Sequence, residues 1–241
     1  MGEFLRVTLP VFAAGALAFW YAGRRVPASV RRARWIKFAT YLVIVHAVLA
    51  AALAGRAAIV ILMAGIAVGG LAETVGACRR IPRGTSLVVP ILFCAVAVGA
   101  VAFGASAPPL LVAYVYSIVA AFDGFSQAGG QLAGRRRLAP TVSPGKTVEG
   151  FLIGIVGAIV CALLLRGAVT VPVTPALLLA VIVSVTGVAG DLAASWVKRR
   201  ASLKDFGTIL PSHGGVLDRF DSFLAAAAAM FVVIRSGWWL A

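Results

Sequence analysis

Charged residues are scarce in this sequence. Asp, Glu, Lys and Arg make up only 12% of its 241 residues, about half the share found in a typical soluble domain, and just eight residues are acidic. Hydrophobic residues account for 61% of the chain, and the mean hydropathy is +1.01. Apolar runs of about 20 residues, long enough to cross a bilayer as helices, recur along the whole length. A soluble fold is therefore excluded, and we expect an all-α fold, a polytopic membrane helical bundle.

Cysteine and histidine are also scarce. The three cysteines, Cys78, Cys94 and Cys161, are scattered without C-x-x-C spacing, which argues against a zinc site or a disulfide framework. His46 lies inside an apolar run and is interpreted as a packing or hydrogen-bonding residue. His213 is the one histidine in a polar stretch.

The apolar runs predict eight membrane spans in a single domain, residues 1–241. No small-residue cleavage site follows the first run, so we expect it to be retained as a helix. Polar residues gather in two stretches, 123–150 and 191–221, so residues 107–241 are the expected catalytic half and residues 1–106 a hydrophobic half. The spans are expected near 7–23, 38–54, 57–77, 85–104, 108–125, 147–165, 174–197 and 217–235.

Basic residues occupy alternate connections between these runs. Eighteen of the 22 lysines and arginines follow the first, third, fifth and seventh runs, and the other four are Arg6, Arg56, Arg166 and Arg235. The positive-inside rule then predicts that the basic side is cytoplasmic in an inner (plasma) membrane, with both termini outside. The net charge of +14 fits this topology and an attraction to anionic lipids and phosphorylated substrates, so no nucleic-acid partner is expected.

The later polar stretch contains three aspartates that are candidates for a metal site. Asp218 and Asp221 are one helical turn apart and share a face, and Asp191, Ser195 and Lys198 form one stripe if the seventh span continues through them. Carboxylates at a membrane edge are costly, so they usually pair or bind ions. Mg²⁺ favours carboxylates together with substrate phosphates and water. The alternative, equally supported by spacing alone, is that these aspartates only neutralise nearby lysines and arginines.

His213 is followed by two glycines, Gly214 and Gly215. Glycine tolerates positive φ, so this backbone can turn sharply and approach a ligand closely. A single histidine is more often structural than catalytic, and spacing alone leaves both readings open.

The earlier polar stretch predicts a helix start that could bind phosphate. Ser143 fits an N-cap and Pro144 the first helical position. Free backbone N–H groups together with Lys146 would then form an anion site. An ordinary cap with a topology-determining lysine explains the same residues equally well. A Walker A loop is rejected, because Pro140 stands where its first glycine is needed.

Both stretches resemble the CDP-diacylglycerol synthases, also called phosphatidate cytidylyltransferases. That family's C-terminal motif is S-x-x-K-R-x-x-x-x-K-D-x-G-x-x-L-P-x-H-G-G-x-x-D-R-x-D, and Ser195 to Asp221 match every fixed position. The family's earlier pattern is D…G…G-x-x-x-L…S-P-x-K-T-x-E-G. It is matched by Asp123, Gly130, Gly134, Leu138, Ser143, Pro144, Lys146, Thr147, Glu149 and Gly150.

The resemblance implies a helical membrane enzyme that commonly dimerises and converts CTP and phosphatidate into CDP-diacylglycerol, with Mg²⁺, alone or with a second metal ion, at a centre that holds the CTP phosphates. The implied metal ligands are Asp191, Asp218 and Asp221. The implied catalytic residues are Lys198, Arg199, Lys204, Asp205, His213 and Arg219. The implied substrate-binding residues are Asp123, Ser143, Lys146, Thr147, Glu149, Ser195, Gly214 and Gly215.

Two positions depart from the family pattern. Ala194 precedes Ser195 where the family usually has glutamate, and Ser126-Gln127 replace a usual Ala-Tyr. The nearest alternative activity is a CTP-dependent kinase of a lipid alcohol such as polyprenol or phytol. A transporter of anionic solutes is disfavoured, because the charges gather at one face rather than at the bilayer midplane.

Overall fold

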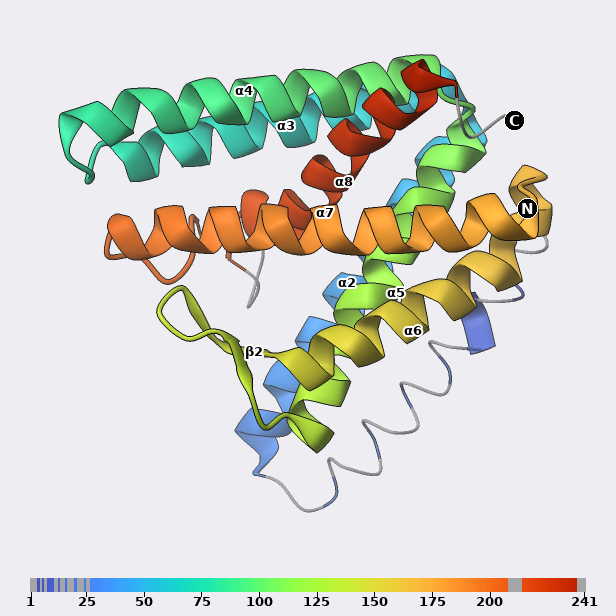
Figure 1. The fold of residues 1–241 in the computed structure, drawn as a ribbon. Helices are drawn as coiled ribbons and strands as arrows, with labels where there is room; N and C mark the ends of the chain where they lie inside the picture. The colour runs from blue at the N-terminus through green and yellow to red at the C-terminus, as the bar shows by residue number, and fades with distance from the viewer. Residues whose placement is uncertain are drawn as a thin grey trace.

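The computed structural model describes residues 27–207 and 214–237 together with a few separate positions between 4 and 24. The described chain is mostly helical (Figure 1). Its helices are α2 (Ala28–Ala54), α3 (Arg56–Cys78), α4 (Arg83–Ser106), α5 (Pro109–Ala133), α6 (Val148–Leu165), α7 (Val173–Arg200) and α8 (Leu217–Ser236), with a short 3₁₀ helix, η1 (Arg166–Val169), after α6.

Several of these helices are long and apolar enough to cross a membrane, which confirms a multi-pass helical membrane protein. They are Arg56–Cys78, Arg83–Ser106, Pro109–Ala133, Val148–Val169 and Val173–Arg200. The predicted total of eight spans is not confirmed. The first predicted span falls largely outside the described residues, the apolar part of α2 is the shorter Phe38–Ala54, and α8 carries Asp218, Arg219 and Asp221 in its first turns.

Proline and glycine set several helix boundaries. Pro108 and Pro109 stand at the start of α5, where a missing N–H costs nothing because the first helical donors have no partner within the helix. Gly55 separates α2 from α3 with a φ of 106°, a conformation that side-chain-bearing residues rarely adopt. The predicted runs near 38–54 and 57–77 therefore become two separate helices.

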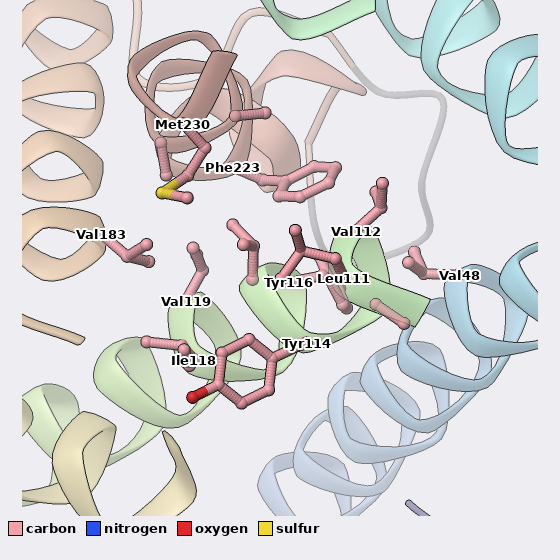
Figure 2. Close-up of a cluster of buried hydrophobic side chains, with 14 of the residues drawn as sticks. Val48, Leu111, Val112, Tyr114, Tyr116, Ile118, Val119, Val183, Phe223 and Met230 are labelled. Atoms are coloured by element: carbon pink, nitrogen blue, oxygen red, sulfur yellow. The ribbon is translucent and has the colours of Figure 1, made fainter. Parts of the chain in front are cut away.

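Helix α5 lies at the centre of the bundle. Residues Leu111 to Tyr116 are all buried, as expected for a helix that is apolar on every side. Figure 2 shows its side chains meeting Val48 of α2, Val183 of α7 and Phe223 of α8. The ring of Tyr116 contacts that of Phe223 edge to face at 5.1 Å between centroids.

The remaining helices pack around α5 in pairs. Helix α6 lies along α5, and α7 lies against α6 and α8. Helices α3 and α4 run side by side, with α8 packed against α4 (Figure 1). The N-terminal helices therefore share one packed bundle with the helices that carry the polar stretches.

A short β-hairpin departs from the all-α expectation. Strand β1 (Arg137–Ala139) pairs antiparallel with β2 (Ser143–Thr147). Pro144 fits there because both strands of a two-stranded sheet are edges and need not donate every N–H. The predicted helix start at Ser143 is wrong: Ser143 pairs with Ala139, and α6 begins at Val148.

Candidate functional site

The two polar stretches meet at one end of the bundle, where α7 ends and α8 begins beside the hairpin (Figure 1). The Arg199 guanidinium donates through Nε to the carbonyl of Val142 in the hairpin turn, at 3.3 Å. Lys198, one residue earlier, contacts Asp218 of α8. Two adjacent residues of α7, Lys198 and Arg199, thus contact α8 and the hairpin, respectively.

An ion pair joins the two stretches directly. Lys146 Nζ on β2 lies 2.5 Å from Asp191 Oδ2 on α7. The Ser195 hydroxyl, one turn further along α7, donates to Asp191 Oδ1 at 3.2 Å. The Lys146 and Asp191 side chains remain 25% and 28% exposed, so both can reach a ligand at this end of the bundle.

Two further aspartates lie near this ion pair. The negative charge of Asp191 acts on both Asp123 of α5 and Asp221 of α8, and the charge of Asp123 also acts on Asp221. The Asp221 carboxylate accepts the N–H of its neighbour Ser222 at 2.7 Å. We call Asp123, Asp191 and Asp221 together with Lys146 the carboxylate cluster. Like charges repel at short range, so this cluster is a suitable place for a bound cation.

Gly190 allows α7 and α8 to approach closely beside the carboxylate cluster. A Cβ at residue 190 would lie 2.8 Å from the Asp221 carbonyl oxygen and would overlap the side chain of Ala225. Any larger residue would therefore push the two helices apart. The glycine preceding Asp191 sets its distance to Asp221.

Asp218 has a different environment, although it is one helical turn from Asp221. Its Oδ1 lies 2.7 Å from Lys198 Nζ, and its Oδ2 accepts the N–H groups of Phe206 and Gly215, each at 2.8 Å. The Asp218 side chain is only 2% exposed and that of Lys198 11%. We call Asp218, Lys198, Phe206 and Gly215 the Asp218 clamp. Of the roughly four acceptor positions of a carboxylate, three are occupied here.

Several predicted substrate-binding residues hold the hairpin and the start of α6. The Thr147 hydroxyl caps α6 by accepting the N–H of Gly150 at 3.1 Å. Glu149, in the first turn of α6, accepts the backbone N–H groups of Arg135 and Arg136 at 2.9 and 3.1 Å. These contacts position Lys146 beside Asp191, and the predicted substrate contacts of Ser143, Thr147 and Glu149 stay predictions.

The remaining predicted residues occupy the rim of the same end. Lys204 and Asp205 are exposed, and Arg199 also bonds to the carbonyl of Leu203. Arg219 lies in the first turn of α8, and its positive charge acts on Asp123. Gly214 has the positive φ expected of it, 84°, whereas His213 lies outside the described residues.

Sequence reasoning missed Glu73. This residue lies near the end of α3, and its carboxylate accepts the N–H groups of Val216 and Leu217 at 2.9 and 2.8 Å. Apart from Glu3, it is the one acidic residue before Asp123. An isolated acid in an apolar run is costly and usually has a partner, so its position alone was a signal.

The donor set is compatible with Mg²⁺ shared with a substrate. Within the described part of the chain, no three Asp, Glu, His or Cys side chains are arranged to hold a metal ion by themselves. Mg²⁺ does not require such a cage, because it is usually bound by one or two carboxylates plus substrate phosphates and water. Asp191 and Asp221 offer such oxygens, and Asp218 has one acceptor position left. Magnesium binding stays a prediction.

Comparison with known proteins agrees with the motif. The chain is 41% identical over 123 residues to a phosphatidate cytidylyltransferase of Bacillus subtilis (strain 168), over 50% of this chain and 46% of that protein. It is 38% identical over 122 residues to one of Brucella abortus, with 50% and 45% covered. It is also 37% identical over 128 residues to the uncharacterized protein YnbB of Escherichia coli (strain K12), with 52% and 43% covered. The chain thus spans less than half the length of these curated relatives.

A family-wide match extends well beyond these alignments. The sequence profile of the cytidylyltransferase family matches residues 7–236, which includes the hydrophobic half as well as both polar stretches. Since that match spans nearly the whole sequence, the protein belongs to the cytidylyltransferase family.

Proposed function

We propose that this protein transfers CMP from CTP to phosphatidate, forming CDP-diacylglycerol and pyrophosphate. The observation that carries the proposal is the Lys146–Asp191 ion pair, which joins both polar stretches beside Asp123 and Asp221 at one end of a membrane bundle. Membership of the cytidylyltransferase family and relatives named phosphatidate cytidylyltransferase support this choice of nucleotide and lipid.

The reaction forms one phosphorus–oxygen bond and breaks another. A phosphate oxygen of phosphatidate attacks the α-phosphorus of CTP. The bond from the α-phosphorus to the oxygen bridging to the β-phosphate breaks, and its electron pair leaves with pyrophosphate. A phosphate monoester has a second pKa of about 6, so the nucleophile is already largely deprotonated at pH 7. The site therefore needs no strong general base.

The main requirement is to hold two anions together. Positioned positive charges lower the barrier by stabilising the charge that develops during phosphoryl transfer. Lys146, Lys204 and Arg219 are our candidates to contact the phosphates from the hairpin, the loop after α7 and the start of α8. Lys198 is paired with Asp218, which holds α7 against α8, and its predicted catalytic role stays a prediction. When bound by Asp191 and Asp221, Mg²⁺ would supply further neutralisation of the CTP phosphates.

Product analysis tests the proposal. Purified protein with Mg²⁺, phosphatidate and CTP labelled in the cytidine should yield labelled lipid and pyrophosphate. Absence of lipid-linked CMP from folded protein, with several phospholipid acceptors tried, would overturn the assignment. Transfer of label from the γ-phosphate of CTP to a lipid alcohol would indicate the kinase instead.

We further propose that the site faces the cytoplasm of a bacterial inner membrane with both termini outside. Basic residues in alternate connections support this orientation. After removal of the native cysteines, single cysteines replacing Ser29, Ser86 or Ser202 should resist impermeant thiol reagents in intact cells, and one replacing the exposed Ser106 should react. Equal labelling of both sets would contradict the orientation.

We expect a homodimer and no nucleic-acid partner. The resemblance to CDP-diacylglycerol synthases is the support for the dimer. Native mass spectrometry in detergent should show a mass twice that of the 24.8 kDa chain; a monomer retaining full activity would contradict it. The basic residues are already accounted for by topology, so nucleic acid added to the assay should not inhibit at physiological salt.

A further inference from the structure

The carboxylate of Glu73 crosses from the hydrophobic half of the chain to the start of α8. Its Oε1 accepts the Val216 N–H at 2.9 Å and its Oε2 accepts the Leu217 N–H at 2.8 Å. The first N–H groups of a helix have no partner within the helix, and a negative charge there also interacts favourably with the helix dipole. Glu73 therefore caps α8 from a helix 143 residues earlier in the chain.

Two motif glycines make room for this carboxylate. A Cβ at Gly207 would lie 2.8 Å from Glu73 Oε1, and a Cβ at Gly215 would overlap the Glu73 carboxylate. A Cβ at Gly207 would also lie 3.3 Å from the Gly215 Cα. The two glycines are thus neighbours, and they bracket the segment of the motif that contains His213.

The Asp218 clamp also holds the backbone next to Gly207 and at Gly215. Asp218 accepts the N–H groups of Phe206, next to Gly207, and of Gly215 itself. Two acidic side chains, Glu73 from α3 and Asp218 from α8, therefore hold the backbone at Phe206 and Gly207 close to that at Gly215. They also occupy the N–H groups of residues 215 to 217, so these three donors are directed at carboxylates rather than at a substrate phosphate.

We propose that Glu73 is a positioning residue of the site, which fixes Gly207, Gly215 and the start of α8 relative to α7. It acts through the backbone of Val216 and Leu217 and does not itself contact substrate. Its kinetic consequence rests on the proposed cytidylyltransferase activity, whereas its structural consequence does not. The hydrophobic half of the chain thereby contributes directly to the geometry of the site.

Glu73→Gln tests this role with little change in shape. The glutamine amide nitrogen is a donor, so it cannot accept one of the two backbone N–H groups. Hydrogen exchange at Val216 and Leu217 should accelerate by about tenfold to hundredfold, the equivalent of one hydrogen bond to a charged group. Turnover efficiency with CTP should fall by a similar factor, with the KM for phosphatidate unchanged.

Thr74→Val is the matched control. Thr74 is buried on the same helix, and its hydroxyl donates to the Gly70 carbonyl of α3 at 2.7 Å, so its loss perturbs α3 without removing a hydrogen bond to Val216 or Leu217. Exchange at Val216 and Leu217 unchanged in Glu73→Gln would overturn the proposal, as would equal acceleration in Thr74→Val. If Glu73→Gln exchanges faster at Val216 and Leu217 but keeps normal CTP kinetics, Glu73 does not position the site. An inactive wild type would refute the proposed function, and the exchange comparison would still decide the structural role of Glu73.

A second pair of variants covers the case in which Glu73→Gln does not fold. Gly215→Ala pushes a methyl group against the Glu73 carboxylate, whereas Gly76→Ala, on α3, places one in open space. The first should accelerate exchange at Val216 and Leu217, and the second should not. The same exchange rates in both variants would contradict the proposal.

Discussion

Asp218 and Asp221 lie one helical turn apart on α8, in opposite chemical situations. In the Asp218 clamp the carboxylate has a lysine and two backbone N–H groups as partners. In the carboxylate cluster, Asp221 accepts the N–H of Ser222 and lies within range of two negative charges, those of Asp191 and Asp123, and of the positive charge of Lys198. Removing a buried carboxylate that has partners strands those partners and costs stability, whereas carboxylates that lie together repel one another and gain from a bound cation. The comparison separates a residue that holds the site from one available to a ligand.

The largest expected effect is on stability in the clamp. Asp218→Asn removes the anion that the nearly buried Lys198 ammonium contacts directly, and removing one partner of a buried pair costs about 3–5 kcal/mol. We expect a clearly lowered melting temperature in detergent, with or without Mg²⁺. The matched control is Asp221→Asn, the same substitution one turn later. An unchanged melting temperature in Asp218→Asn would contradict the structural role that distinguishes Asp218 from Asp221.

Asp221→Asn should mainly affect turnover. The substitution relieves repulsion in the carboxylate cluster, so the melting temperature without Mg²⁺ should stay the same or rise. Asp221 is a ligand of the proposed Mg²⁺, which would help to hold the CTP phosphates. Loss of this ligand should lower turnover at saturating CTP by about 10²–10³-fold. Melting curves with and without Mg²⁺ beside steady-state rates measure both. Near-normal turnover would remove Asp221 from the proposed metal site.

Lys146→Met should give the next largest loss. A charge-assisted phosphate contact contributes about 1.5–3 kcal/mol, so kcat/KM for CTP should fall by about tenfold to hundredfold. Arg80→Met is the control, because Arg80 is an exposed basic residue in the connection between α3 and α4. If both variants retain normal kinetics, Lys146 is a topology determinant and a partner of Asp191 only.

Ser195→Ala should give the smallest effect. Its hydroxyl donates to Asp191 Oδ1 at 3.2 Å, and a hydrogen bond of this kind contributes about 0.5–1.5 kcal/mol. We expect a loss of about twofold to tenfold in kcat/KM. Ser184→Ala, on the same helix with its hydroxyl bonded to Ala180, should be kinetically silent. A loss as large as that of Lys146→Met would mean that Ser195 contacts substrate.

Much of the fold was predictable because a membrane helix requires a long run of apolar residues, which is visible in the sequence. Long apolar runs located α3, α4, α6 and α7 to within about three residues at each end, whereas α5 continues to Ala133, beyond the predicted end at residue 125. The hairpin was not predictable in this way. Ser143-Pro144 has the local chemistry of a helix start, and only pairing with Ala139 assigns it to a strand.

Residue types and motif spacing determined by themselves the family, the helical membrane character and the residues to inspect, because apolar length and a long fixed motif are properties of the chain alone. Which carboxylate meets which partner was decided by tertiary packing. Asp191 meets Lys146, Asp218 meets Lys198, and Glu73 caps α8 only because helices distant in sequence pack together. A side chain's hydrogen bonds and burial depend on its neighbours in space, and sequence spacing specifies those neighbours only within one helix.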